Sequence, residues 1–338
     1  MSFVRNLVAS AAVALVGTTP VIADEIPFRI SLNTGPNHVR NIALENFFET
    51  LAERAEGQLD VQVFPSGQLF GGPDVPRALA QGSIEMGVPI ITYLSSVVPN
   101  SGLLDLPMFY GRSVEDIHAI MDGELGAELN AEIEEVVGVH VIGPYLDLGH
   151  GSIFTTDREL NGLADLDGLT LRVPGSPASR VRYDSLGVQS VAIGFGDVPI
   201  ALSQGSIDGL MTTHETIRSA QLWESGLSYA LDTQGTFFMY VPMIGLETWD
   251  SFSPELQQII TETWAETVGE ARALAATRQL EARAEAEANG VTVVQAPEEE
   301  LTQFRQQLME AQDQIIADTR MDADFIDRVA AALQGLDG

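Results

Sequence analysis

The sequence predicts an α/β protein built from two units, and three observations support this fold class. Short apolar stretches of alternating pattern are interleaved with segments of helical spacing along most of the 338 residues. Hydrophobic residues make up 45% of the chain, which is typical of a globular protein, and the length suits about two domains. No proline- or serine-rich linker separates the two units, so we expect two lobes that share crossing strands.

The first 23 residues are typical of a cleaved secretory signal peptide. Arg5 supplies positive charge, residues 7–16 form a short apolar run, and Ala23 is a small residue at the expected cleavage point. A membrane anchor is the alternative, but the run is shorter than the roughly 20 residues that a spanning helix needs. We therefore predict that the mature chain begins at Asp24 and works outside the cytoplasm.

The first unit has the βαβαβ order of a doubly wound sheet. Alternating apolar residues predict its strands, and apolar residues at helical spacing predict a helix that Gly57 ends. The expected elements are a strand at 26–32, a helix at 41–55, a strand at 59–64, a helix at 73–81, a strand at 84–90, a helix at 114–135 and a strand at 139–145.

The second unit alternates in the same way and leads into a long helix. Its expected elements are strands at 170–173, 190–192 and 209–212, with helices at 179–186 and 198–204. Ser253 followed by Pro254 then begins the strongest helix of the sequence, which Asn289 and Gly290 end. After it we expect a strand at 291–294 and two amphipathic helices, at 297–318 and 322–333.

The long helix would run on the order of 50 Å at 1.5 Å per residue, which exceeds one small lobe. It must therefore brace both lobes or be broken. A coiled-coil partner is the competing interpretation, but the Ala-, Arg- and Glu-rich stretch at 272–288 lacks a sustained apolar seam.

Composition excludes several classes of function. All 17 basic residues are arginine, so Schiff-base chemistry, pyridoxal phosphate attachment and a phosphate-binding loop with lysine are excluded. A net charge of −31 disfavours any nucleic-acid partner, because binding to phosphates requires clustered positive charge. The chain has no cysteine, which excludes disulfides, thiolate metal sites and thiol nucleophiles.

The sequence shows no catalytic arrangement. Its five histidines are scattered without the spacing of a metal site, and no GxSxG nucleophile motif is present. Paired acids carry little information among 48 carboxylates. We predict no cofactor, no metal and no enzymatic activity.

One arginine lies in an apolar setting. Arg172 comes near the end of the expected strand at 170–173, and ligands of open α/β sheets bind at the carboxyl ends of strands. A guanidinium can hold a carboxylate through two parallel hydrogen bonds. A surface salt bridge with one of the many acids is the alternative.

Over essentially its whole mature length, the chain resembles the DctP-type solute-binding proteins of tripartite ATP-independent periplasmic (TRAP) transporters. Five runs in the same order carry the resemblance: VQVFPSGQLFGG at 61–72, LLDLPMFYGR at 103–112, LADLDGLTLRVPGSP at 163–177, ALSQGSIDG at 201–209 and WDSFSPELQQII at 249–260. The resemblance implies a two-lobed periplasmic binding protein fold with crossing strands and a long bracing helix. It also implies a hinge that closes around a small organic anion.

The resemblance assigns five positions to ligand binding. Arg172 matches the arginine that holds the ligand carboxylate in relatives, and Phe195 matches an aromatic residue that packs on the ligand. Asn33 stands where some relatives have an asparagine in the first strand-to-helix loop. Two positions depart from the family: Ser152 replaces a second arginine of certain relatives, and Thr212 replaces the asparagine that most have.

Three further residues are weaker candidates. Tyr93 and His214 could each give a hydrogen bond to the ligand, although ordinary packing is the more frequent role for such residues. Phe237 belongs to an aromatic cluster where a crossing strand should pass the cleft. Arg180 and Arg182 could also supply charge, but we expect their helix to point both toward solvent.

The sequence therefore predicts an extracytoplasmic binding protein, a monomer, that captures a small organic carboxylate and delivers it to the membrane permease subunits of a TRAP transporter. A binding protein of an ATP-driven importer and a secreted α/β enzyme are the alternatives. Because Ser152 replaces a second arginine, we expect a monocarboxylate whose other end is hydroxylated or apolar. The expected units are a signal peptide at 1–23, lobe I at 24–147, lobe II at 148–231, and a crossing strand, bracing helix and returning C-terminal helices at 232–338.

Overall fold

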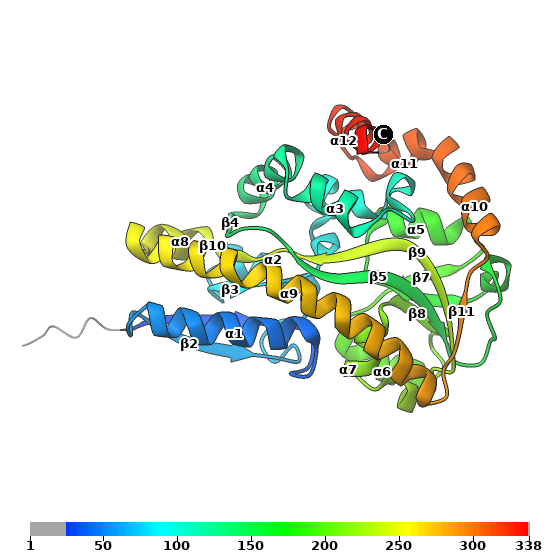
Figure 1. Ribbon diagram of the computed structural model, residues 1–338, viewed down its shortest axis with the longest axis horizontal. Coiled ribbons are helices and arrows are strands. Elements are labelled where there is room, and N and C mark those ends of the chain that lie inside the picture. The colour runs from blue at the N-terminus through cyan, green and yellow to red at the C-terminus, as the bar shows by residue number, and fades with distance from the viewer. Residues whose placement is uncertain (1–24, 337–338) are drawn as a thin grey trace, which may run out of the picture.

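The computed structural model describes residues 25–336, which form a mixed α/β protein with two sheets (Figure 1). The predicted signal peptide lies outside the described residues. Within the described part, no helix is long and apolar enough to cross a membrane. The two-sheet architecture confirms the predicted fold class, whereas the residue limits of the two lobes stay a prediction.

The first lobe is built on a five-stranded sheet with the order β2-β1-β3-β10-β4. Strand β1 pairs in parallel with β2 and β3, and β10 runs antiparallel to β3 and β4. The helices of this lobe pack on the sheet because their apolar residues recur at helical spacing. The elements are β1 (Ile26–Ser31), α1 (Val39–Arg54), β2 (Leu59–Phe64), α2 (Val75–Ala80), β3 (Met86–Gly87), α3 (Val114–Met121), α4 (Glu124–Val137), β4 (Val139–Val141), β10 (Met243–Gly245) and α8 (Leu246–Ser251).

The second lobe is built on a six-stranded sheet with the order β11-β9-β5-β8-β6-β7. Helices cover both of its faces, as a doubly wound sheet requires. The elements are β6 (Thr170–Val173), α5 (Pro177–Asp184), β7 (Gln189–Ala192), α6 (Val198–Ser203), β8 (Gly209–Thr212), α7 (His214–Ser219), β11 (Thr292–Gln295) and α10 (Glu298–Glu310).

Two long strands, β5 (Leu146–Thr155) and β9 (Tyr229–Tyr240), cross from one lobe to the other (Figure 1). They pair antiparallel along their length, with two irregularities in register between residues 147 and 152. Such bulges bend a strand, which suits a strand that runs from one lobe into the other. Strand β5 was not among the expected elements, because Gly149 and Gly151 interrupt its apolar alternation.

The long helix α9 (Pro254–Ala288) is unbroken and contacts both lobes. Of the two alternatives, a brace for both lobes or a broken helix, the structure therefore shows the brace. The Ser253 hydroxyl accepts a hydrogen bond from the backbone N–H of Leu256, which caps the helix as expected. Near its start the Trp264 ring packs edge-on against Phe47 of α1, at 5.1 Å. Near its end Ala286 is buried in the core of the second lobe. Figure 1 shows this helix lying across the crossing strands.

Four expected elements differ from the structure. The helix expected at 114–135 is two helices, α3 and α4, because the chain is extended at Gly123. The helix expected at 297–318 is also two, α10 and α11 (Gln312–Thr319), so that with α12 (Ala323–Leu336) the tail has three helices. The strand expected at 84–90 forms only the short β3 and one isolated bridge from Ile90 to Tyr240, and Pro89 lacks the N–H that would join them into one ladder. Of the strand expected at 139–145, only β4 forms.

Candidate ligand-binding site

Arg172 lies on β6 with its guanidinium buried between the lobes. Only 2% of the residue is exposed. Its Nε donates a hydrogen bond to the carbonyl oxygen of Ile193 (3.2 Å), and its Nη2 donates to the hydroxyl of Tyr93 (3.3 Å). Tyr93 belongs to the first lobe, in the segment that follows β3. Among residues 25–336, no carboxylate pairs with this guanidinium. Since a buried charge normally needs a partner, the arrangement suits an anionic ligand.

A small cavity lies against Arg172, and both lobes and the crossing strand β9 contribute to its wall. Its volume is about 20 Å³, which is close to the space that one water molecule occupies. A ligand of several heavy atoms would therefore have to enter while the lobes are further apart, and the cavity wall would have to adjust to enclose it. The wall consists of Asn33, Thr34, Ile90, Tyr93, Leu148, Arg172, Pro174, Phe195, Thr212, Thr216, Phe238 and Tyr240.

Five of the eight candidate residues meet at this cavity. Arg172, Thr212 and Phe195 come from the second lobe, and Asn33 and Tyr93 come from the first. The Phe195 ring centroid lies 6.0 Å from the guanidinium carbon of Arg172, so the aromatic side chain flanks the charge. Parallel strands β6 and β8 end at the same edge of the sheet, which brings Arg172 and Thr212 together.

The other three candidates, Ser152, His214 and Phe237, line a different groove between β5, β9 and α9. Its volume is about 400 Å³. The Ser152 hydroxyl donates to Asp232 Oδ1 (2.5 Å), and His214 Nε2 lies 2.7 Å from the same oxygen. Burial disfavours the charged carboxylate, but the hydrogen bonds from His214, Ser152 and Arg283 outweigh it and lower the pKa of Asp232. Ser152 is thus hydrogen-bonded to Asp232 and is not among the residues that line the cavity at Arg172.

Arg40 lies behind residues that line the cavity, and the sequence did not single it out. It lies in the first turn of α1 and is 2% exposed. Its guanidinium lies 4.5 Å from the ring centroid of Tyr240 and donates to Asn33 and Thr34, all three of which line the cavity. An arginine among the buried positions of an apolar helix face is the signal that could have found it.

Arg182 corrects another expectation. It does not point to solvent, because only 3% of the residue is exposed, whereas Arg180 is exposed as expected. The Arg182 guanidinium stacks over the ring of Tyr110, 4.3 Å from its centroid, and donates to the Thr236 hydroxyl (3.1 Å). That hydroxyl in turn donates to Asp105 (3.2 Å). Arg182 therefore joins α5 to β9 and takes no part in the cavity at Arg172.

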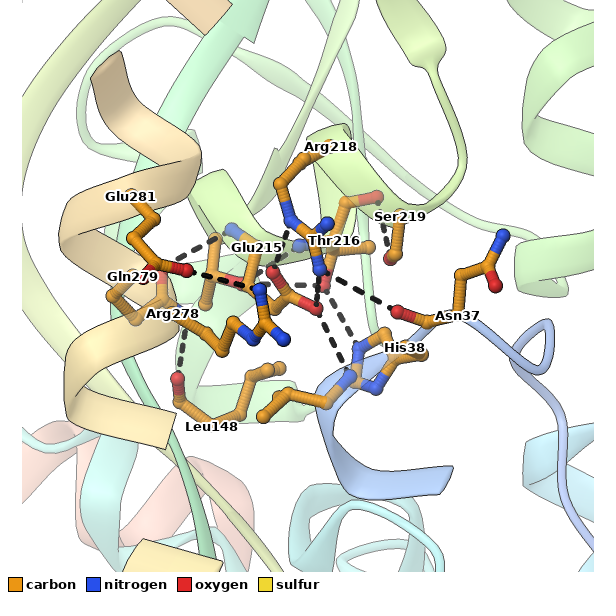
Figure 2. Close-up of polar contacts among 12 residues, drawn as sticks. Asn37, His38, Leu148, Glu215, Thr216, Arg218, Ser219, Arg278, Gln279 and Glu281 are labelled. Atoms are coloured by element: carbon orange, nitrogen blue, oxygen red, sulfur yellow. Dashed lines mark hydrogen bonds and ion pairs between the residues drawn. The ribbon is translucent and has the colours of Figure 1, made fainter. Parts of the chain in front are cut away.

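A polar network connects the two lobes beside the cavity (Figure 2). Glu215 of α7 accepts a hydrogen bond from the backbone N–H of Val39 at the start of α1 (2.9 Å), and Arg218 donates to both of its oxygens (2.8 and 2.9 Å). A carboxylate is stabilised at a helix N-terminus by the helix dipole. The network thus forms only when the lobes are close together.

His38 and Gln279 extend this network (Figure 2). His38 Nε2 lies 3.4 Å from the Thr216 hydroxyl, and burial with the nearby charges of Arg40 and Arg218 lowers the pKa of His38 well below its usual value. Gln279 of α9 accepts from the backbone N–H of Glu215 (3.1 Å) and donates to the carbonyl oxygen of Leu148 in β5 (2.5 Å). The bracing helix is therefore hydrogen-bonded to both the start of α7 and a crossing strand.

No group of three or more histidine, aspartate or glutamate side chains in residues 25–336 is arranged to hold a metal ion. The Ser152, Asp232 and His214 cluster places the carboxylate between the hydroxyl and the imidazole. A nucleophile-base pair requires the hydroxyl and imidazole to contact each other directly, and this cluster does not provide that contact.

Comparisons with known proteins identify the family of the chain. The family model "Bacterial extracellular solute-binding protein, family 7" (DctP) matches residues 30–319. The 2,3-diketo-L-gulonate-binding periplasmic protein YiaO of Escherichia coli is 25% identical, with 80% of each chain covered. The C4-dicarboxylate-binding periplasmic protein DctP of Rhodobacter capsulatus is 23% identical, also with 80% of each covered.

Solved structures show the same fold. The sugar acid binding protein DctPAm of Advenella mimigardefordensis, in complex with galactonate, superposes with a TM-score of 0.87 at 20% identity, covering 92% of this chain and 99% of that one. A TRAP periplasmic solute binding protein of Sulfurospirillum deleyianum with bound succinate gives 0.83 at 20% identity, covering 92% and 100%. The chain therefore belongs to the DctP family, the bacterial extracellular solute-binding proteins of family 7, and works in the periplasm with a TRAP transporter.

Proposed function

We propose that the solute captured by this protein is a small monocarboxylate carrying hydroxyl groups. It would be enclosed when the lobes close and then handed to the permease subunits of the TRAP transporter. The observation that carries the proposal is Arg172, a buried guanidinium at the cavity between the lobes that has no carboxylate partner among the described residues. A ligand carboxylate would supply the missing charge.

The free donors of Arg172 support a bidentate contact. Two of the five guanidinium N–H groups donate to described residues, one each from Nε and Nη2. The remaining three are available to a carboxylate, which a planar guanidinium holds through two parallel hydrogen bonds. Phe195 beside the guanidinium would exclude water from that pair.

Hydroxylation of the solute is supported by the rest of the wall. Thr34, Thr212, Thr216, Tyr240 and Asn33, all with polar side chains, are among the residues that line the cavity. Such groups recognise hydroxyls well, whereas a second buried carboxylate would need its own charge partner. Relatives of the same fold were solved with galactonate, D-glucuronate and β-D-galacturonate, which are hydroxylated monocarboxylates, and one with succinate.

The proposal includes binding without turnover. The hydroxyl nearest to a histidine in the second groove, Ser152, donates to Asp232 instead of to an imidazole. The proposed solute should therefore be recovered chemically unchanged after prolonged incubation with the protein. Conversion of a bound acid would favour the alternative of a secreted enzyme.

A thermal-shift screen of organic acids, followed by calorimetry, tests the proposed function. A ligand that binds only the folded state raises the apparent melting temperature. We expect hydroxylated monocarboxylates to give the largest shifts, and Arg172→Ala to weaken their binding at least a hundredfold, or about 3 kcal/mol. Arg172→Lys should not restore affinity, because an ammonium cannot form the bidentate pair.

The matched control is Arg180→Ala, which removes an exposed arginine from the helix that follows β6. It should leave affinity unchanged, since surface charges contribute little. Native affinity in an Arg172→Ala variant that melts as a folded protein would refute the assignment.

A further inference from the structure

The first lobe holds a second buried positive charge, on Arg40, that forms no ion pair with any residue from 25 to 336. All five N–H groups of Arg40 donate to neutral oxygens: to Asn41 Oδ1 twice (both 3.1 Å), Asn33 Oδ1 (3.0 Å), the Val88 carbonyl (2.9 Å) and the Thr34 hydroxyl (2.7 Å). Burial lowers the pKa of Arg40, with the neighbouring phenols of Tyr240 and Tyr93 opposing the shift. Because every donor is used, Arg40 has none left for a ligand.

These hydrogen bonds determine how the loop between β1 and α1 faces the cavity. Arg40 donates to Asn33 Oδ1, so that oxygen is turned toward the guanidinium. The Asn33 amide nitrogen is then the polar atom left for the cavity, and no described residue accepts from it. The Thr34 hydroxyl accepts from Arg40 and donates to Asn41 (3.1 Å), which fixes that side chain as well.

We propose that Arg40 is a positioning residue for ligand recognition: it turns the Asn33 N–H groups toward the ligand and adds its positive charge to that of Arg172. This inference rests on the proposed function. The ligand would then contact donors on both walls, Arg172 on the second lobe and Asn33 on the first. The side of the ligand that faces Asn33 must present acceptor oxygens, as a hydroxylated acid does.

Asn33→Asp tests this arrangement directly. The new carboxylate would pair with Arg40 and would replace the donor N–H groups by acceptor oxygens. We expect the melting temperature without ligand to rise and the dissociation constants of galactonate and D-glucuronate to increase at least tenfold. Asn37→Asp is the matched control, since it adds the same charge to an exposed position of the same loop and should change neither dissociation constant more than twofold.

Arg40→Met supplies the second arm. In that background Asn33→Asp should lower the melting temperature, because the carboxylate would be buried without its partner. Arg40→Met itself should weaken galactonate about tenfold and weaken the dianion succinate by a larger factor, since each ligand charge loses an attraction. A merely structural role would weaken both acids by the same factor. If Arg40→Met does not fold, Asn33→Asp and its control decide alone.

The outcomes separate this inference from the proposed function. If galactonate and D-glucuronate bind, depend on Arg172, and are unaffected by Asn33→Asp, the role of Arg40 is refuted and the proposed function stands. If neither galactonate, D-glucuronate, β-D-galacturonate nor succinate binds the native chain, the proposed function fails and this inference fails with it.

Discussion

Glu215 connects the lobes through its hydrogen bond to the start of α1, so the loss of its charge tests whether closure is part of binding. The residue is fully buried, and its carboxylate accepts from the Val39 N–H at 2.9 Å. The pair with Arg218 lies within α7 and persists when the lobes separate. Of these two contacts of the Glu215 carboxylate, the one with the helix N-terminus is the one that depends on closure.

Glu215→Gln keeps an acceptor for Val39 but removes the charge. A hydrogen bond to a charged group contributes about 1.5–3 kcal/mol, and a neutral one about 1 kcal/mol. The interaction of the carboxylate with the helix dipole adds about 0.3–1 kcal/mol. The closed state should thus lose roughly 1.5 kcal/mol, which corresponds to about a tenfold increase in the dissociation constant of the solute.

Calorimetry measures this change in the dissociation constant. The measurement is made far below the melting transition, because the variant also removes the carboxylate that pairs with Arg218 and can lower the stability of the fold. The matched control is Glu270→Gln, which removes an equal charge from an exposed position of α9. Small-angle scattering should show a larger radius of gyration for Glu215→Gln than for the control at a subsaturating ligand concentration. A dissociation constant within twofold of the native value would refute the role of this contact in closure.

Four further predictions concern the ligand, the hinge, pH and packing. In a series of acids of equal length, the monocarboxylate should bind more tightly than the dicarboxylate, and the opposite preference would show that a second cation reaches the ligand. The radius of gyration should fall when a saturating ligand closes the lobes, and identical scattering curves would indicate a rigid scaffold. Burial lowers the pKa of His150 to about 4, with Asp147 opposing, so the native state binds fewer protons than the unfolded state between pH 4 and 6.5. Stability should therefore fall as pH falls through that window, by up to about 1.4 kcal/mol per pH unit from this residue, and His150→Gln should flatten the slope measured by denaturant unfolding at several pH values. A Cβ at Gly235 would overlap the Arg182 guanidinium, so Gly235→Ala should destabilise the protein by about 1–3 kcal/mol, whereas Gly269→Ala, with open space in the middle of α9, should stabilise it by about 0.5–1 kcal/mol in chemical denaturation.

Local patterns determined much of the fold. Strands β2, β6 and β8 and the limits of α9 follow from signals within a few residues of each element: alternation for the strands, and Ser253 and Asn289 at the ends of the helix. The crossing strand β5 could not be predicted in the same way. Its glycines lack any local preference for a strand, and its partner β9 lies about eighty residues further along the chain.

For the candidate site, too, part could be predicted from local sequence and part could not. Arg172 could be found because the charge stands alone within an apolar strand, and parallel strands carry their ends to the same edge of a sheet. Phe195, Thr212 and Asn33 follow from the family resemblance, and Tyr93 follows from its place after the third expected strand. The structure brings all four together with Arg172 at one cavity. Their roles in binding stay predictions.

By itself, the sequence determined the α/β class, the two-lobed family, the bracing helix and one buried charge, because each of these is encoded by residue type and short spacing. The tertiary structure decided which side chains share a cavity. Ser152 is turned to Asp232 and away from Arg172, while Arg40 is brought beneath the cavity wall by neighbours on three separate segments. Hydrogen-bond partners of buried polar groups come from distant parts of the chain, so only the folded packing selects them.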